Sequence, residues 1–276
     1  YYKIKMLEKI GIMQGRLVER EIKSRLQSFP KKNWIKEIKL ARKLKIKFIE
    51  WTLDYKNFYQ NPLIKNPTKL KSILSNNNIS VKTVTCDFFM QKPPFKDNSF
   101  STEYLIKLIS AAKTLGMKCI IIPLVDNSSI KNSINEKKII KYFKDLKKKV
   151  SLGNIKIAFE LDLKPIRVFN FIKNFDNSFG VNYDLGNSAF YGYYFNNEKI
   201  YFSRVINIHL KDRNQLGYSV PFGKGKAEFD NLFKYIKKIK YKNLFILQSY
   251  IPKKIGSKTH TLKNLEFIKQ FYDKKK

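Results

Sequence analysis

Eight short apolar segments recur along the chain at intervals of 24 to 39 residues. Most of them are rich in β-branched or aromatic residues and end in polar or turn residues, as buried strands do. Four consecutive apolar residues, as in LFILQ, are typical of a parallel strand that is buried on both faces. The segments are IGIM (10–13), KFIEW (47–51), VKTVTC (81–86), CIIIPL (119–124), IKIAFEL (155–161), FGVNYDL (179–185), VINIHL (205–210) and LFILQ (244–248).

Helical patterns lie between most of these segments. Apolar residues recur at helical spacing over 34–44, 105–115, 139–150, 229–236 and 262–271. Asn66-Pro67 and Asn135 have the character of helix starts, and Gly116 that of the residue after a helix end. The interval after the sixth segment, FYGYYFNNEKIYFS, shows no clear helical period.

Eight strands that alternate with seven or eight helices within about 250 residues predict a (β/α)8 TIM barrel. Composition shows no break that would mark a second domain, so we expect one α/β domain over residues 1–276. A doubly wound open sheet is the alternative, but no strand is followed by a GxGxxG motif or a P-loop.

The net charge of +34 raises the question of a nucleic-acid partner. The charge comes from 49 Lys and only 7 Arg, and the lysines are spread along the chain. Dedicated DNA readers usually concentrate their charge and use Arg for bidentate contacts. We therefore expect a solvated basic surface with a general attraction for anions, and no specific nucleic-acid site.

The two cysteines, Cys86 and Cys119, form neither a CxxC motif nor a disulfide framework. They are expected at opposite ends of neighbouring parallel strands, where no bridge can form. No apolar run approaches the roughly 18 to 20 residues that span a bilayer, and the N-terminus lacks the pattern of a signal peptide. We expect reduced cysteines, no membrane association and a cytoplasmic location.

Polar residues with metal-ligand chemistry end four successive strand segments: Glu160, Asp184, His209 and Gln248. In a barrel, the carboxyl ends of strands spaced by about 4.8 Å would bring these side chains within one coordination sphere. Two carboxylates and an imidazole suit Mn²⁺, Mg²⁺, Co²⁺ or Zn²⁺, and the amide oxygen of Gln248 completes the set. We predict one divalent ion at these residues, whereas His260 is expected near the start of the last helix.

Several motifs resemble a single family, in the same order along the chain. The motifs GIMQGRL, QSFPKKNWIKEIKLARKLKIKFIEWTLDY, TVTCDFFM, FELD, YDLGN and HLKDR are similar to the sugar phosphate isomerase/epimerase group. This group belongs to the xylose isomerase-like TIM barrels, which are relatives of AP endonuclease family 2. The resemblance implies a divalent metal on Glu, Asp, His and Glu from strands five to eight. Here these positions hold Glu160, Asp184, His209 and, as a departure, Gln248.

The resemblance also implies a reaction class. In related ketose 3-epimerases, substrate oxygens chelate the metal and glutamates on opposite faces of the substrate move the proton. Gln248 cannot act as such a base, because an amide oxygen lacks the basicity of a carboxylate. We predict a metal-dependent isomerase or epimerase of sugars or sugar phosphates, with proton abstraction α to a carbonyl and Glu160 as the base.

Three reactions remain open within this class. A one-base isomerase would use Glu160 alone. An epimerase would need another base on the opposite face, and Asp54, Asp87, Lys211 and Asp212 are its candidates. A dehydratase of a keto-sugar or cyclitol would begin with the same proton abstraction.

Further residues at the strand ends are candidates for the catalytic and substrate-binding sites. Lys211 would neutralise developing oxyanion charge, and Asp212 would orient His209 or Lys211. Asn187 is expected to cap the following helix. The predicted substrate-binding residues are Gln14, Arg16, Glu50, Trp51, Asp87 and Arg213.

Two other functional classes are compatible with such a barrel. An AP endonuclease would need several histidines for a trinuclear zinc site, and the chain has two. A non-catalytic sugar-binding barrel is suggested by Gln248 at a position that the family uses for catalysis. Aromatic residues over 191–195 indicate a contact surface compatible with a homo-oligomer.

Overall fold

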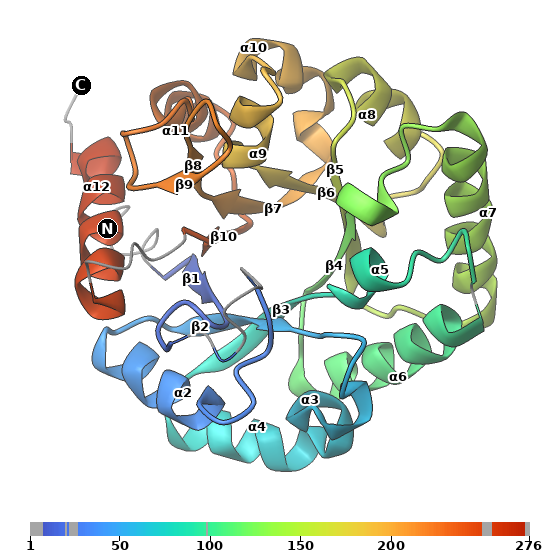
Figure 1. Cartoon of the computed structure of the whole chain (residues 1–276), viewed down its shortest axis with the longest axis horizontal. Coiled ribbons are helices and arrows are strands. Elements are labelled where there is room, and N and C mark those ends of the chain that lie inside the picture. The colour runs from blue at the N-terminus through green and yellow to red at the C-terminus, as the bar shows by residue number, and fades with distance from the viewer. Residues whose placement is uncertain (1–7, 20, 22–26, 98, 250–255, 274–276) are drawn as a thin grey trace.

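The eight apolar segments form one closed, parallel barrel encircled by helices (Figure 1). The computed structural model describes residues 8–273 except 20, 22–26, 98 and 250–255. Each strand pairs with its neighbour in the chain, and the last strand pairs with the first, so the predicted TIM barrel is confirmed. The strands are β1 (Ile10–Met13), β2 (Phe48–Thr52), β3 (Ser80–Thr85), β4 (Cys119–Leu124), β5 (Lys156–Leu161), β6 (Phe179–Asp184), β7 (Val205–Leu210) and β10 (Leu244–Leu247).

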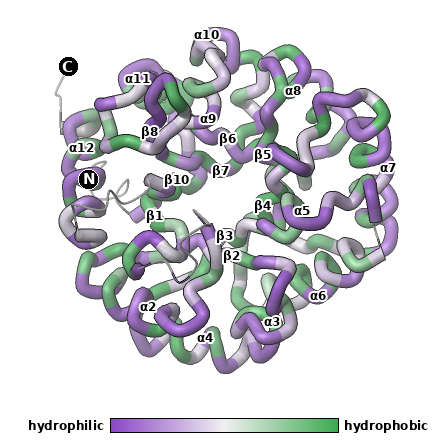
Figure 2. The backbone as a smooth tube through the Cα atoms, in the orientation of Figure 1, coloured by the Kyte–Doolittle hydropathy of each residue, from purple (hydrophilic) through white to green (hydrophobic). Residues whose placement is uncertain are grey.

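The longer helices lie outside the strands, and Figure 2 shows hydrophobic and hydrophilic residues alternating along them. Asn66 caps α4 as predicted, because its side chain accepts a 2.9 Å hydrogen bond from the backbone N–H of Lys69. The predicted start at Asn135 is wrong, since Asn132 caps α7 through the N–H of Ile134. These helices are α2 (Trp34–Lys43), α4 (Pro67–Asn76), α6 (Ser99–Leu115), α7 (Ser133–Lys149), α8 (Pro165–Ile172), α11 (Phe229–Lys238) and α12 (Ser257–Asp273).

Short helices and a small hairpin occupy the loops. The interval after β6, where the sequence shows no helical period, contains only such short elements. They are α3 (Pro62–Lys65), α5 (Phe88–Gln91), α9 (Leu185–Phe190), α10 (Phe195–Glu198), the 3-10 helices η1 (Phe58–Gln60), η2 (Asp126–Ser128) and η3 (Lys199–Arg204), and the paired strands β8 (Asp212–Arg213) and β9 (Ser219–Val220).

Side chains fill the barrel lumen, so the interior is a packed core. Phe48, Met13 and Ile246 form one fully buried cluster there. Gly11 makes room for it, because a Cβ atom at this position would lie 2.2 Å from the Phe48 ring. This packing supports the polar residues that stand above it at the carboxyl ends of the strands.

Residues next to the predicted ligands point outward and fix the strands against the helices. Phe159, which precedes Glu160, packs its ring 4.9 Å from that of Phe143 on α7. Tyr183, which precedes Asp184, donates a 2.6 Å hydrogen bond to Glu198. Since neighbouring residues of a strand face opposite ways, anchoring Phe159 and Tyr183 outside directs Glu160 and Asp184 inside.

Glu198 is buried and accepts hydrogen bonds from the hydroxyl groups of Tyr183, Ser188 and Tyr201. Burial raises its pKa from 4.5 to about 7 in spite of these donors. The folded protein therefore binds more protons than the unfolded chain between these two pH values, so stability falls as pH rises through this window.

We expect Glu198 to contribute up to about 3 kcal/mol to this fall in the free energy of unfolding. The Glu198→Gln variant should therefore lose less stability than the wild type between pH 4.5 and 7. Urea unfolding at both pH values measures the difference. Equal pH dependence of the two proteins would contradict the raised pKa of Glu198.

Both cysteines are buried, and neither forms the bridge that the sequence pattern excluded. Cys119 pairs in register with Thr83 at the start of β4, whereas the backbone N–H of Cys86 bonds the carbonyl of Ile121 further along that strand. No helix in the described part of the chain is long and apolar enough to cross a membrane.

Candidate metal centre

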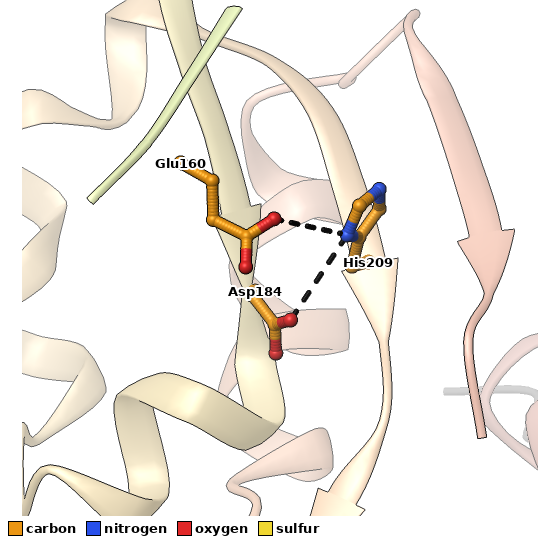
Figure 3. A group of neighbouring side chains, drawn as sticks. All are labelled: Glu160, Asp184 and His209. Atoms are coloured by element: carbon orange, nitrogen blue, oxygen red, sulfur yellow. Dashed lines mark ion pairs between the residues drawn. The ribbon is translucent and has the colours of Figure 1, made fainter. Parts of the chain in front are cut away.

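Glu160, Asp184 and His209 meet at the carboxyl ends of β5, β6 and β7. Nδ1 of His209 lies 3.4 Å from Oε2 of Glu160 and 4.0 Å from Oδ2 of Asp184. Figure 3 shows both carboxylates directed at this nitrogen. One ligand atom from each residue lies within 4.8 Å of the other two, and all three residues are buried. Two carboxylate oxygens and one imidazole nitrogen in this arrangement fit a divalent cation.

Glu50 holds the other side of the His209 ring. Its Oε1 atom lies 2.8 Å from Nε2 of His209, and neither side chain is exposed. Burial lowers the pKa of His209, but the carboxylates of Glu50 and Glu160 outweigh burial and raise it from 6.5 to about 10. This raised pKa favours the doubly protonated ring in the metal-free protein. A metal ion would displace the proton from Nδ1, while the proton on Nε2 stays with Glu50 and keeps Nδ1 directed at Glu160 and Asp184.

A buried polar network fixes Glu50 and Glu160 within the lumen. Oε2 of Glu50 accepts a 2.9 Å hydrogen bond from Thr83 and a 3.4 Å bond from Asn207. Asn182 donates to Glu160 at 2.9 Å and accepts from Asn207 at 2.8 Å. The network joins β2, β3, β5, β6 and β7, so the orientation of the site depends on closure of the whole barrel.

Replacing Glu50 by glutamine should weaken divalent-metal binding about 10-fold to 100-fold, because the imidazole loses the carboxylate that orients it and raises its basicity. Isothermal titration with Mn²⁺ measures the change. Glu37→Gln is the matched control, since Glu37 is also fully buried but bonds the backbone N–H groups of Gly15 and Leu17. Equal affinity of Glu50→Gln and the wild type would show that Glu50 does not prepare His209 for the metal.

Gln248 follows β10, two residues beyond Ile246, whose side chain faces the lumen. Strand alternation therefore directs Gln248 to the same side. Its Oε1 atom is buried and has no hydrogen-bond partner among the described residues. A buried oxygen without a partner is costly, so this atom suits a metal or substrate contact.

A cavity of about 470 Å³ opens at this mouth of the barrel. Its size falls within the range of small-molecule sites. The charged residues of its lining include Arg16, Asp87, Glu160, Lys211 and Arg213, and Gln248 also contributes. The cavity therefore brings together three of the six predicted substrate-binding residues: Arg16, Asp87 and Arg213.

Gln14, Glu50 and Trp51 do not line this cavity. The carbonyl oxygen of the Gln14 side chain accepts a 3.0 Å bond from the N–H of Thr52, which ties the ends of β1 and β2 together. Trp51 is fully buried outside the barrel, where its indole N–H bonds Asn61 at 2.8 Å. The substrate contacts that we predicted for these three residues therefore find no support in the structure.

Asp212 also lies away from the cavity lining. Its carboxylate accepts hydrogen bonds of 2.9 to 3.0 Å from the backbone N–H groups of Gly223, Gly225 and Ala227. Asp212 therefore anchors the loop after β9. The residue that orients His209 is Glu50, and not Asp212 as predicted. We therefore assign Asp212 a structural role in place of the catalytic role predicted for it.

Lys211 and Arg213 flank Asp212 and face the cavity. Nζ of Lys211 lies 2.7 Å from Oδ2 of Asp184, so it neutralises charge beside the candidate metal ligands. Arg213 donates to Oδ1 of Asn187 at 2.7 Å, and its guanidinium lies 4.0 Å from the centre of the Phe190 ring.

Three site residues were missed or misassigned in the sequence. Asp184, and not Asn187, caps α9, and Asn187 bonds Glu160 at 3.0 Å. Asn182 could have been found, because it precedes Asp184 by two residues and strand alternation places both on one face. Gln27 bonds Asp87 from a loop 60 residues away, and no sequence pattern indicates that contact.

A closed parallel barrel with a buried carboxylate–imidazole cluster and a cavity at the carboxyl ends of its strands defines a TIM barrel with an enzyme-like site. The family can be stated more closely. The model of the family described as Xylose isomerase-like TIM barrel matches residues 38–271, and the chain belongs to this family. No curated protein sequence matches the chain closely enough to count as a relative.

Solved structures share the fold at low sequence identity. The IOLI protein with a binding zinc atom is 15% identical, with a TM-score of 0.74 over 96% of this chain and 100% of its own. The 3-keto-D-glucoside 4-epimerase of E. coli is 11% identical, with a TM-score of 0.70 over 95% and 99% of the two chains. D-Psicose 3-epimerase from Clostridium cellulolyticum H10, solved with D-tagatose, is 13% identical, with a TM-score of 0.65 over 96% and 97%.

Proposed function

We propose that this chain is a metal-dependent isomerase or epimerase of sugars or sugar phosphates that removes a proton next to the substrate carbonyl. The convergence of Glu160, Asp184 and His209 beside a cavity of about 470 Å³ carries this proposal. Membership of the xylose isomerase-like family and the sugar epimerases among its structural neighbours support the same substrate class.

Asp184, His209 and Glu160 would hold the ion, and Oε1 of Gln248 is the fourth candidate ligand. When bound, a divalent ion would polarise the carbonyl of the substrate and acidify the neighbouring C–H group. Glu160 is the proposed base, because it lines the cavity as well as facing the cluster. Lys211 would balance negative charge that develops on the substrate oxygens.

Hydrogen-bond donors around the cavity suit a polyhydroxylated substrate. Arg16 and Arg213 both line the cavity. Arg16 donates a hydrogen bond to the backbone carbonyl of Gln248, and Arg213 donates one to the side-chain oxygen of Asn187, so both of these partners are neutral. We propose that these two arginines and Asp87 contact the substrate. The guanidinium groups can bind hydroxyl, phosphate or carboxylate groups of the substrate.

The proposal is tested by incubating the Mn²⁺-loaded protein with ketoses, aldoses and their phosphates and identifying the products by NMR. An isomer or epimer supports it. A dehydrated keto-sugar would show that the same site is a dehydratase. Sugar binding without turnover, at every pH and with every metal tried, would make the protein a binding barrel.

A further inference from the structure

The described part of the cavity lining contains three carboxylates: Asp87, Asp126 and Glu160. Inversion at a carbon needs a second proton-transfer group on the face opposite Glu160. Gln248 cannot be this group, because its side chain is an amide and has no carboxyl group to accept or donate a proton. Asp126 is exposed at the rim, whereas Asp87 is only 2% exposed. Asp87 is therefore the buried carboxyl group available beside Glu160.

Asp87 approaches the cavity from a different wall than Glu160. It follows β3, whereas Glu160 is the second-to-last residue of β5. Strand β4 lies between these two strands, and its Pro123 also lines the cavity. Asp87 precedes helix α5 at the N-cap position, but its side chain makes no capping hydrogen bond. The side chain is thus not needed to cap this helix.

The carboxyl group of Asp87 is held firmly in another way. Nε2 of Gln27 lies 2.9 Å from both of its oxygens, and the hydroxyl of Thr85 donates to Oδ1 at 3.2 Å. Burial raises the pKa of Asp87 well above its usual range, and the charges of Asp54 and Glu160 add to the rise. The hydrogen bonds from Gln27 and Thr85 act against this rise. A raised pKa favours the protonated form of the carboxyl group, which is the form that donates a proton to a substrate.

The other candidates for the second base are less well placed. Asp54 accepts hydrogen bonds from the backbone N–H of Phe29 and from Gln91, and it is not part of the cavity lining. Asp212 is bound by the loop after β9. Lys211 is paired with Asp184, on the same side of the cavity as the metal ligands.

We propose that Asp87 is the second catalytic proton-transfer residue and that the enzyme is an epimerase. Glu160 takes the proton from the carbon next to the carbonyl, and the C–H electron pair becomes the carbon–carbon double bond of an enediolate. When the carbonyl re-forms, this carbon takes a proton from Asp87 on the opposite face. Glu160 then releases its proton to water, and Asp87 takes up a proton from water, which restores the starting state of the enzyme. In the reverse reaction Asp87 removes the proton and Glu160 donates one.

This inference rests on the proposed function, and it is tested with the Mn²⁺-loaded protein in D2O. The probes are D-fructose, D-tagatose and the 6-phosphates of both, and NMR measures deuterium at C3 and the yield of the C3 epimer. Asp87→Asn should lower epimer formation at least about 100-fold. Deuterium exchange into the recovered substrate should persist within a few-fold, because Glu160 still acts on its own face.

Matched measurements separate this role from a structural one. Asp162→Asn removes a carboxylate that pairs with Lys131 outside the cavity lining, and it should keep the wild-type ratio of exchange to epimerisation. Mn²⁺ affinity and thermal stability of Asp87→Asn should equal those of the wild type. A parallel loss of exchange and epimerisation in Asp87→Asn, or no loss of either, would overturn the inference.

The wild type separates this inference from the proposed function. Transfer of hydrogen between C1 and C2 without a C3 epimer would overturn the role of Asp87 and leave an isomerase. Absence of exchange and of any product from all four probes would overturn both.

Discussion

Replacing Glu160 by glutamine is expected to lower the rate of solvent deuterium exchange next to the substrate carbonyl by about 10²-fold to 10⁴-fold. An amide of the same shape keeps an oxygen near Nδ1 of His209 but cannot accept the proton of the substrate. NMR of the substrate in D2O measures the rate. Because Glu160 is both a candidate ligand and the candidate base, Mn²⁺ affinity must be measured on the same variant.

Asp162→Asn is the matched control for this prediction. Asp162 lies two residues after Glu160, but its carboxylate pairs with Lys131 at 3.1 Å and accepts from Ser129 at 2.9 Å. We expect this variant to exchange at the wild-type rate. Unchanged exchange in Glu160→Gln, with metal still bound, would exclude Glu160 as the base.

Replacing His209 by alanine should have the second large effect. We expect Mn²⁺ affinity to fall at least about 100-fold, since the imidazole is the proposed nitrogen ligand of the cluster. The metal-free protein should also lose roughly 3 kcal/mol of stability, because Glu50 would remain buried without its cation. Titration calorimetry and urea unfolding measure the two quantities.

The second histidine provides the control for His209→Ala. His260 lies on α12, where it contacts Ser249 at 2.9 Å and Asn264 at 3.1 Å. His260→Ala removes a buried ring that is not part of the Glu160, Asp184 and His209 cluster, and it should leave Mn²⁺ affinity unchanged. Equal metal affinity in the two alanine variants would contradict the proposed ligand set.

The sequence was sufficient to predict the barrel because buried strands and amphipathic helices carry local patterns. The segment IGIM became β1 without a shift, and Asn66-Pro67 marked the start of α4. The same segments carried Glu160, Asp184 and His209 at their ends, so the meeting of these three side chains could be predicted once the barrel was assumed.

Roles within the site were harder to predict, because they depend on which way each side chain faces. Glu50 and Trp51 are neighbours in β2, so alternation sends one into the lumen and the other into the outer core. Asp212 and Arg213 are also neighbours that face opposite ways: Asp212 bonds the loop after β9, whereas Arg213 lines the cavity. Strand alternation applied to each pair would have removed Trp51 from the candidates.

Contacts across the lumen and between loops could not be predicted from the sequence. Glu50 and His209 are 159 positions apart in the chain, yet they lie 2.8 Å apart across the lumen. Gln27 reaches Asp87 from a loop whose sequence has no helical or strand period. Closure of the barrel creates these neighbours, and a single sequence contains no local signal for them.

Solvent deuterium exchange by the wild-type protein tests the central claim most directly. The protein is loaded with Mn²⁺ and incubated in D2O with D-fructose, D-tagatose and their 6-phosphates, with and without a chelator. We predict metal-dependent incorporation of deuterium at the carbon next to the carbonyl of at least one substrate. Tight Mn²⁺ binding without exchange into any of them would contradict an enzyme that works by proton abstraction.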